Sequence, residues 1–201
     1  MGELGIDVSD HNVITNWDTV YSWGYDFVYV KGNEGTSTVY PSCSSQLAGA
    51  RAAGLLTGLY HYAQFSNSPF ASAAAFAEVC IENNALSAES LTPCIDMETC
   101  DDQNADNWLN TFAHQFALIT GYYGSLMIYA SAELFIDEQI SDDGGWWLWV
   151  ASWGSPLRNP TYLSPRVALH QFTNQAGVPG IEGSCDASYS IQPISAITVT
   201  P

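Results

Sequence analysis

Eight short runs of β-branched, aromatic and aliphatic residues recur along the chain, and segments with helical signals separate them in its first two-thirds. Alternating strands and helices are typical of a parallel sheet whose strands are joined by crossover helices. Eight such strands predict an α/β barrel, and the loss of helices toward the carboxyl end predicts an incomplete helical ring. The predicted strands are residues 4–9, 26–31, 57–62, 91–99, 126–130, 146–152, 167–172 and 181–186.

The predicted helices carry recognisable end signals. Ser68 followed by Pro69 is a favourable helix start, and Gly54 directly follows an Ala-rich segment, where it favours a helix end. After the second strand, the sequence Gly32-Asn33-Glu34-Gly35 predicts a turn. The predicted helices are residues 16–23, 43–53, 69–81, 106–120 and 132–139.

Length and charge limit the classes of protein that this chain can belong to. The 201 residues predict a single domain covering 1–201, and a hydrophobic content of 47% excludes a disordered chain. Four Lys and Arg against 21 Asp and Glu give a formal charge of −17, which repels nucleic acid and anionic lipid. No apolar run approaches the roughly 20 residues that a membrane span needs. We therefore expect no nucleic-acid partner and no membrane partner.

The amino terminus and the cysteines bear on cellular location. Met1-Gly2-Glu3 leads almost directly into a strand, so a secreted form would have lost its signal or would use another route of export. The cysteines have no metal-ligand spacing and the four histidines are scattered, so we expect no metal site. In a secreted protein one or two disulfides are expected, and two pairings stay open: Cys94–Cys100, if the chain reverses after Glu98, and Cys43–Cys80. The fifth cysteine is Cys185.

Two carboxylates end the predicted strand 91–99. Side chains of a strand alternate between faces, so Asp96 and Glu98 point the same way, about 7 Å apart, while Ile95 and Met97 point into packing. Repulsion and partial burial raise the pKa of one acid of such a pair, which leaves a proton donor beside an anion. That combination suits cleavage of a glycosidic bond. A Ca²⁺ ligand pair or two solvated acids are the alternatives for this short motif.

Polar residues recur at the ends of the other predicted strands. Because the active sites of such barrels lie at the carboxyl ends of the strands, we expect these residues to meet at one end of the barrel. Lys31, one of four cations, is expected to pair with acids nearby, and Trp146, Trp147 and Trp149 are expected to pack. The residues at or just past a strand end are Asp7, Lys31, Tyr62, Asp96, Glu98, Tyr129, Trp153, Gln171 and Asp186.

The order and spacing of several motifs give the chain a family resemblance. It resembles glycoside hydrolase family 25, the Chalaropsis-type lysozymes or N-acetylmuramidases, over nearly its whole length. Each motif is short, but together they extend over most of the sequence. The motifs are Gly5-Ile6-Asp7-Val8-Ser9, Phe27-Val28-Tyr29-Val30-Lys31, Glu34-Gly35, Tyr60-His61-Tyr62, Ile95-Asp96-Met97-Glu98 and Cys185-Asp186.

This resemblance implies a flattened (β/α) barrel that cuts the β-1,4 bond between N-acetylmuramic acid and N-acetylglucosamine in peptidoglycan. On that basis Glu98 matches the general acid, and Asp96 matches the acid that orients the acetamido group or supports positive charge. Asp7 and Asp186 match carboxylates that flank the groove. The resemblance further implies a secreted or phage-type monomer that needs no cofactor. The expected substrate-binding residues are Lys31, Glu34, Tyr62, Tyr129, Trp153 and Gln171.

Three departures from the family pattern concern the surroundings of the acids. Asn33 stands where Ser or Thr is usual, His11 lies in an unusual Asp-His-Asn segment, and His170 replaces a common Trp before Gln171. Attack by the acetamido oxygen of the substrate, or by water with inversion, would both fit the acid pair. The rival functions are a chitinase-like or endo-N-acetylglucosaminidase, a non-catalytic glycan-binding barrel, and a metal-dependent hydrolase using Asp7, Asp96 and Asp186.

Overall fold

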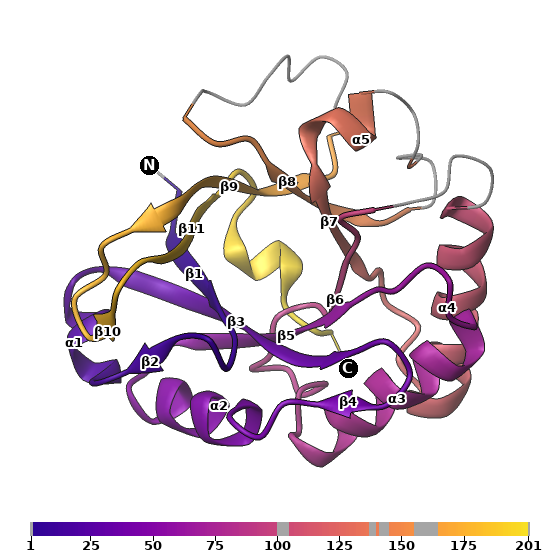
Figure 1. The fold of residues 1–201 in the computed structure, drawn as a ribbon, viewed down its shortest axis with the longest axis horizontal. Coiled ribbons are helices and arrows are strands. Elements are labelled where there is room, and N and C mark those ends of the chain that lie inside the picture. Colours follow the sequence, from indigo (N-terminus) through magenta and orange to yellow (C-terminus); the bar gives the residue numbers. More distant parts are fainter. Residues whose placement is uncertain (1, 100–104, 137–139, 141–144, 155–164, 201) are drawn as a thin grey trace.

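A closed barrel forms the centre of the protein in a computed structural model that describes residues 2–99, 105–136, 140, 145–154 and 165–200. Eight strands follow one another around it in the order β1-β11-β9-β8-β7-β6-β5-β3, and pairing of β3 with β1 closes the ring (Figure 1). This architecture confirms the predicted irregular α/β barrel. The strands are β1 (Leu4–Val8), β3 (Tyr25–Glu34), β5 (Leu56–Tyr62), β6 (Cys94–Asp96), β7 (Met127–Ser131), β8 (Trp147–Ala151), β9 (Val167–Ala176) and β11 (Cys185–Ser190).

The last strand departs from the all-parallel prediction. Strand β11 runs antiparallel to both β1 and β9, whereas the other neighbouring barrel strands are parallel. Residues 177–184, between β9 and β11, are fewer than the dozen or so that a parallel crossover requires. The predicted strand 181–186 is also wrong, because Ile181–Glu182 forms β10 and pairs with β2 (Val13–Ile14) outside the barrel.

Two other strand boundaries differ from the sequence prediction. Strand β3 continues through the predicted turn to Glu34, with a register shift between Lys31 and Asn33. Gly32 packs so closely there that an added Cβ would lie 3.2 Å from Val79, and Asn33 pairs with Val39 of β4 (Thr38–Val39). The turn-forming residues therefore mark a bulge. Strand β6 is shorter than predicted and ends at Asp96, so Glu98 follows the strand.

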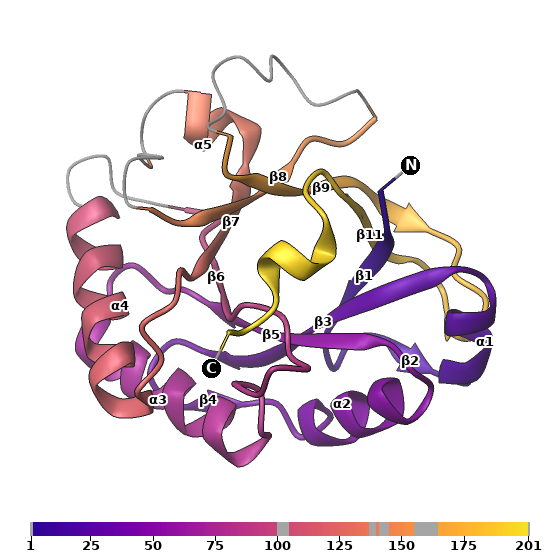
Figure 2. The ribbon, with the colours of Figure 1, turned by 180° about the vertical axis from the view of Figure 1, so that it is seen from behind.

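Most of the helices cover the barrel at the bottom and right of Figure 1, whereas the first helix lies at the left and the last at the top, and the reverse view shows the same arrangement (Figure 2). Asn16 caps the first helix by accepting a hydrogen bond of 2.9 Å from the Thr19 amide. Pro69 begins α3 after Ser68, as predicted. The predicted residues 137–139 of the last helix lie outside the described residues. The helices are α1 (Trp17–Ser22), α2 (Cys43–Ala52), α3 (Pro69–Glu82), α4 (Ala105–Thr120) and α5 (Ala132–Ile136).

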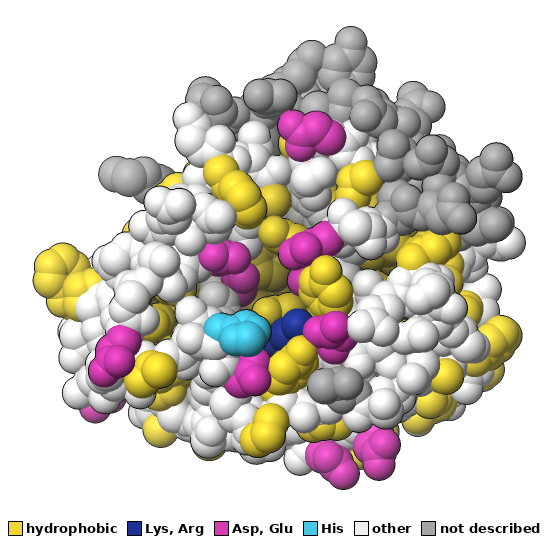
Figure 3. Space-filling view, viewed as in Figure 1, with side chains coloured by type: hydrophobic (Ala, Val, Ile, Leu, Met, Phe, Trp, Pro, Cys, Tyr) yellow, Lys and Arg dark blue, Asp and Glu magenta, His cyan; other side chains and the backbone are white. Residues whose placement is uncertain are grey.

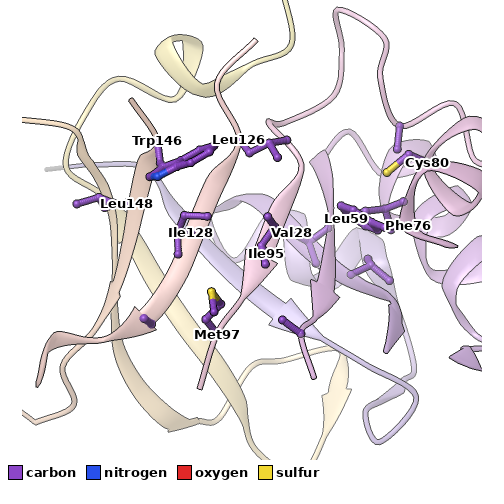
Figure 4. Close-up of a cluster of buried hydrophobic side chains, with 14 of the residues drawn as sticks. Val28, Leu59, Phe76, Cys80, Ile95, Met97, Leu126, Ile128, Trp146 and Leu148 are labelled. Carbon is purple, nitrogen blue, oxygen red and sulfur yellow. The ribbon is translucent and has the colours of Figure 1, made fainter. Parts of the chain in front are cut away.

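Alternation of side chains along the strands produces two hydrophobic cores. Outward-facing residues such as Val28, Ile95 and Ile128 pack together with the helices, where Phe76 of α3 contributes (Figure 4). Inward-facing residues, with Tyr29 and Trp149 among the largest, fill the barrel. Burial of these apolar surfaces is the main force that stabilises the fold.

Small residues and a short terminal helix complete the barrel interior. Gly5 and Gly58 leave room for aromatic rings, since a Cβ at these positions would lie within 2.1 Å of Phe27 and 2.4 Å of Tyr29 respectively. The 3₁₀ helix η2 (Ile194–Ile197) lies across one end of the barrel (Figure 2), where the Ile197 carbonyl accepts a hydrogen bond of 2.8 Å from Thr92. The opposite end stays accessible.

The cysteines in the described part of the chain are buried free thiols, namely Cys43, Cys80, Cys94 and Cys185. The Cys43–Cys80 pairing considered from the sequence is therefore not formed in this structure, and Cys100 lies outside the described residues. Among the described helices, none combines the length and the apolar character needed to cross a membrane.

Candidate active site

The carboxyl ends of the parallel strands bring most of the predicted site residues to one pocket. Strand register aligns Tyr62 of β5 with Asp96 of β6, and Asp96 with Tyr129 of β7. Asp7 of β1 lies opposite Asp186 of the antiparallel β11. Figure 3 shows acidic side chains around this hollow, together with basic, histidine and hydrophobic groups. The pocket is lined by Asp7, Ser9, His11, Lys31, Tyr60, Tyr62, Asp96, Glu98, Tyr129, Trp149 and Asp186.

Two further pockets adjoin this central pocket and extend it into a groove. One of them shares Glu98 and Tyr129 with the central pocket and also contains Trp153. The other shares Tyr62 and also contains Glu34. Glu98 therefore lies where two sections of the groove meet, a position from which it can reach a bond between two neighbouring units of a bound polymer.

Asp7 and Asp186 lie opposite each other in the register of β1 and β11, and their carboxyl groups interact as a pair. Burial and the charge of Asp186 raise the pKa of Asp7 well above its usual value, and burial raises the pKa of Asp186. Two carboxyl groups in such contact cannot both ionise at low cost, so the pair shares one proton over a range of pH.

Asp96 and Glu98 face the same pocket from different environments. Asp96 is only 7% exposed, and its Oδ1 has no hydrogen-bond partner among the described residues. Burial, followed by the charges of Glu98 and Asp7, raises the pKa of Asp96 well above its usual value. Glu98 is exposed and accepts a hydrogen bond of 3.2 Å from the Tyr62 hydroxyl. A buried carboxyl therefore lies two residues from an accessible one.

A second group of site residues, which we call the lysine cluster, is built around the charged Lys31 and Glu34. It also contains Tyr40, Tyr62 and Gln64. Lys31 and Glu34 form an ion pair of 2.9 Å, which confirms that Lys31 pairs with a nearby acid. Glu34 also accepts hydrogen bonds from Tyr40 at 2.7 Å and from Gln64 at 2.8 Å. The Lys31 ammonium lies 4.7 Å and 4.5 Å from the ring centroids of Tyr40 and Tyr62. The cluster fixes one wall of the groove.

The charges of the lysine cluster support each other. The hydrogen bond from Lys31 lowers the pKa of Glu34, and the attraction outweighs the effect of partial burial. Burial alone would lower the pKa of Lys31, but its contacts with Glu34 and Tyr40 raise it overall. Both groups are therefore charged near neutral pH.

Gln171 is the one predicted site residue that does not line any of these three pockets. It is 1% exposed and lies behind the pocket wall, where it contacts Asp7, Asp186, Tyr129 and Trp153. The other nine predicted residues line the central pocket or one of its two extensions.

Sequence reasoning did not assign to the site Ser9, His11, Tyr60 and Trp149 of the central pocket, or Tyr40 and Gln64 of the lysine cluster. Tyr60 shares a strand face with Tyr62, and Trp149 shares one with Ala151 along β8, so strict alternation from known positions would have indicated both. Tyr40 reaches Glu34 from beyond β4, and His11 lies in the loop after β1, so neither carries a local signal. Trp149 also packs in the barrel, as expected, and its indole donates to Ser188 at 3.0 Å.

The residues that the structure describes contain no group of three or more His, Cys, Asp or Glu side chains that could hold a metal ion. The carboxyl groups of the pocket instead interact with each other and with neutral donors. Their arrangement can supply a proton and an anion to one bound molecule.

Comparison with protein families agrees with this geometry. The model of the glycosyl hydrolases family 25 matches residues 6–181. The chain belongs to glycosyl hydrolase family 25. The matched segment includes nine of the ten predicted site residues, from Asp7 to Gln171, whereas Asp186 follows it.

Relatives within family 25 show the same similarity. The chain is 28% identical over 210 residues to Lysozyme M1 of Streptomyces globisporus, covering 92% of this chain and 66% of that protein. It is 29% identical over 136 residues to the N,O-diacetylmuramidase of Chalaropsis sp., covering 61% of this chain and 64% of that protein. The chain thus spans less than two thirds of the length of these relatives.

A solved structure supports the fold assignment. The bacterial lysozyme from Streptomyces coelicolor superposes with a TM-score of 0.80 at 26% identity, covering 99% of this chain and 98% of that one. The two barrels therefore share the same overall arrangement over nearly their whole lengths, including the terminal strands.

Proposed function

We propose that this family 25 protein is a lysozyme of the N-acetylmuramidase type, which hydrolyses the β-1,4 bond between N-acetylmuramic acid and N-acetylglucosamine in peptidoglycan. The observation that carries this proposal is the position of Glu98. Its accessible carboxyl lies where two sections of a groove meet, beside the buried Asp96. A glycan strand in the groove would present a glycosidic oxygen to that carboxyl.

Glu98 acts as the general acid. Breaking a glycosidic bond requires a proton on the leaving oxygen while positive charge develops at the anomeric carbon. Glu98 donates its proton to that oxygen as the bond between oxygen and anomeric carbon breaks, and the departing sugar gains a hydroxyl. The Tyr62 hydroxyl, 3.2 Å from Glu98, orients the carboxyl group.

Asp96 supports the other half of the reaction. The acetamido oxygen of the substrate attacks the anomeric carbon as the leaving oxygen departs, which gives a positively charged oxazolinium ring. The unpartnered Oδ1 of Asp96 accepts the acetamido N–H and stabilises that charge. Water then adds at the anomeric carbon and gives its proton to Glu98, which restores the acid and retains the configuration. Direct attack by water would instead invert it.

The remaining site residues position the glycan strand. Trp153, which is 53% exposed, and the rings of Tyr62 and Tyr129 provide surfaces for sugar faces, and the lysine cluster holds Tyr62 in place. Asp7 and Asp186 complete the acidic side of the central pocket. As proposed, the enzyme acts as a single domain and a monomer, requires no metal or cofactor, and reaches bacterial cell walls after export or phage-type release.

The test is reducing-end analysis of purified peptidoglycan digested by the protein and by Glu98→Gln. We expect new muramic acid reducing ends with the unaltered protein and a rate about 1000-fold lower with the variant, a typical loss for a general acid. Glu89→Gln, which neutralises an exposed acid near the start of β5 at the other end of the barrel, is the matched control and should retain full activity. Digestion with a chelator present should proceed unchanged.

Each other outcome identifies a rival function. N-Acetylglucosamine at the new reducing ends would indicate an endo-N-acetylglucosaminidase or a chitinase-like enzyme. Loss of activity in chelator would indicate a metal-dependent hydrolase. Binding of peptidoglycan without cleavage would indicate a non-catalytic barrel, and inverted products in the NMR spectrum of the first turnover would exclude the acetamido route.

A further inference from the structure

Gln171 occupies a central position between the acids and the aromatic wall. It lies on β9, where its Cα neighbours are Ala151 on β8 and Ser188 on β11. Its amide nitrogen donates to Asp7 at 3.0 Å and to Asp186 at 3.3 Å. Its carbonyl oxygen accepts from the Tyr129 hydroxyl at 2.9 Å and from the Trp153 indole at 2.8 Å.

The chemistry of Trp153 fixes the orientation of this amide. An indole N–H can only donate a hydrogen bond, so the Gln171 atom that faces it must be the oxygen. The nitrogen must then face the two carboxyl groups, which accept hydrogen bonds when ionised. Both hydrogens and both lone pairs of the amide are thereby used within the protein. No polar atom of Gln171 is left for a bound sugar.

The Gln171 amide is neutral and donates two hydrogen bonds, which suits a pair of carboxyl groups, Asp7 and Asp186, that carries one charge in total. A lysine at this position would remove the net charge of the pair, and a glutamate would add a third anion. The amide instead stabilises the ionised form of each partner without adding charge, and it opposes the effect of burial on Asp7. Other ionisable groups that interact with the pair or line its pocket are Asp96, Glu98, Tyr60, Tyr129, Cys94, Cys185, His11 and Lys31.

The carbonyl side of the same amide holds the aromatic wall. Trp153 is half-exposed at the groove, in the section that shares Glu98 with the central pocket. Its indole nitrogen donates a hydrogen bond to the Gln171 amide, the same group that contacts Asp7 and Asp186. A sugar lying against Trp153 would therefore be placed at a fixed distance from the carboxyl groups.

We propose that Gln171 is a positioning residue whose amide nitrogen bridges the carboxyl groups of Asp7 and Asp186 and whose carbonyl oxygen aligns Trp153 with them, rather than a residue that binds the sugar directly. The role in turnover rests on the function proposed above. The effect on the carboxyl pair does not depend on that function, which allows the two to be tested separately.

The experiment compares Gln171→Met, which keeps the side-chain length without hydrogen bonds, with Gln171→Glu, which replaces the donor by an acid. Protein labelled with ¹³C at the aspartate carboxyl groups is titrated by NMR, and kcat and KM are measured against pH. Loss of the donor should move the titration of the pair to higher pH in both variants. In Gln171→Met, kcat should fall about 10-fold to 100-fold, as expected for lost hydrogen bonds to charged groups. Gln171→Glu should recover part of its activity as the pH falls.

Gln192→Met is the matched control, because Gln192 is partly buried and its amide nitrogen also donates a hydrogen bond, of 3.1 Å, to the carbonyl of Pro165, which precedes β9 at the end away from the pocket. It should leave the aspartate titration and the shape of the pH profile unchanged. An unchanged titration in the Gln171 variants would overturn the proposal, as would the same shift in Gln192→Met. If Gln171→Met does not fold, Gln171→Glu carries the same test. A protein without activity whose titration shifts as expected would refute the proposed function and leave the positioning role intact.

Discussion

Two groups of carboxylates in the same groove have pKa values that are shifted in opposite directions. Glu34 of the lysine cluster contacts Lys31, Tyr40 and Gln64, and its pKa is lowered. Asp7 and Asp96 face other acids in a partly enclosed pocket, and burial first, then charge repulsion, raises the pKa of each. The difference arises from neighbours and burial, because all these groups are carboxyls at strand ends.

The charges of the lysine cluster stabilise the structure, whereas those of the acidic pocket serve the chemistry of the site. In the lysine cluster opposite charges are paired, so the groove wall is stable and ionised near neutral pH. In the acidic pocket the protein keeps carboxyl groups whose repulsion is costly to the fold, a common feature of active sites. Substitutions in the two groups should therefore have opposite effects on stability and very different effects on activity.

After Glu98→Gln, the largest effect is expected for Asp96→Asn. This substitution keeps the shape of the side chain but removes the anion that stabilises the developing positive charge. Peptidoglycan hydrolysis should fall by about 100-fold in kcat, a loss typical for one preorganised electrostatic group. Initial rates of reducing-end release measure it, with Glu89→Gln as the control for loss of a negative charge. A variant with more than a third of the normal rate would remove Asp96 from the chemistry.

The next effect concerns the pH dependence of activity. The raised pKa values of Asp7, Asp96 and Asp186 mean that the pocket gains negative charge as the pH rises through them. The chain already carries a formal charge of −17, which repels anionic wall polymers. We expect a maximum below pH 7 and a decrease of about tenfold by pH 8, as for deprotonation of one essential group. A maximum above pH 8 at constant ionic strength would contradict this.

Asp186→Asn should stabilise the protein at neutral pH. Because the pKa of Asp186 is raised in the folded state, its contribution to stability is present below the unfolded value of about 4 and is lost as the pH rises through the folded value. Asparagine avoids that loss, so the variant should gain about 1 kcal/mol at pH 7 and nothing at pH 3. Urea unfolding followed by tryptophan fluorescence measures both values. A variant less stable at pH 7 than the unaltered protein would refute burial of the Asp186 charge as the dominant effect.

Most of the barrel could be predicted because its signals are local. Short runs of β-branched, aromatic and aliphatic residues identified the strands, and the location of polar residues at their carboxyl ends identified eight of the pocket residues, from Asp7 to Asp186. The bulge at Gly32 could not be distinguished from a turn, since both favour the same residues and the choice depends on packing against Val79. The antiparallel direction of β11 could have been predicted, because the connection 177–184 is too short for a parallel crossover.

The network around Gln171 depends on contacts that are distant in sequence. Asp7 is 164 residues away from Gln171, and Tyr129 is 42 residues away. A strand-end position predicts that Gln171 lies near the acids, but it does not tell whether the amide faces the groove or the space behind it. That choice is set by the bond to Trp153, a residue of another strand end.

The smallest effect is expected for Glu34→Gln, and its pH dependence should be opposite to that of Asp186→Asn. The pKa of Glu34 is lowered in the folded state, so its contribution is present above the unfolded value of about 4.3 and is lost as the pH falls through the folded value. The side chain is 26% exposed, which limits the loss at pH 7 to about 0.5 kcal/mol. Urea unfolding at pH 7 and pH 3 should show that the difference disappears at the lower pH. Salt at 1 M should reduce it at pH 7, because screening weakens an ion pair near the surface. If Glu34→Gln and Asp186→Asn changed stability with the same sign at pH 7, the two groups of carboxylates would not differ as their neighbours indicate.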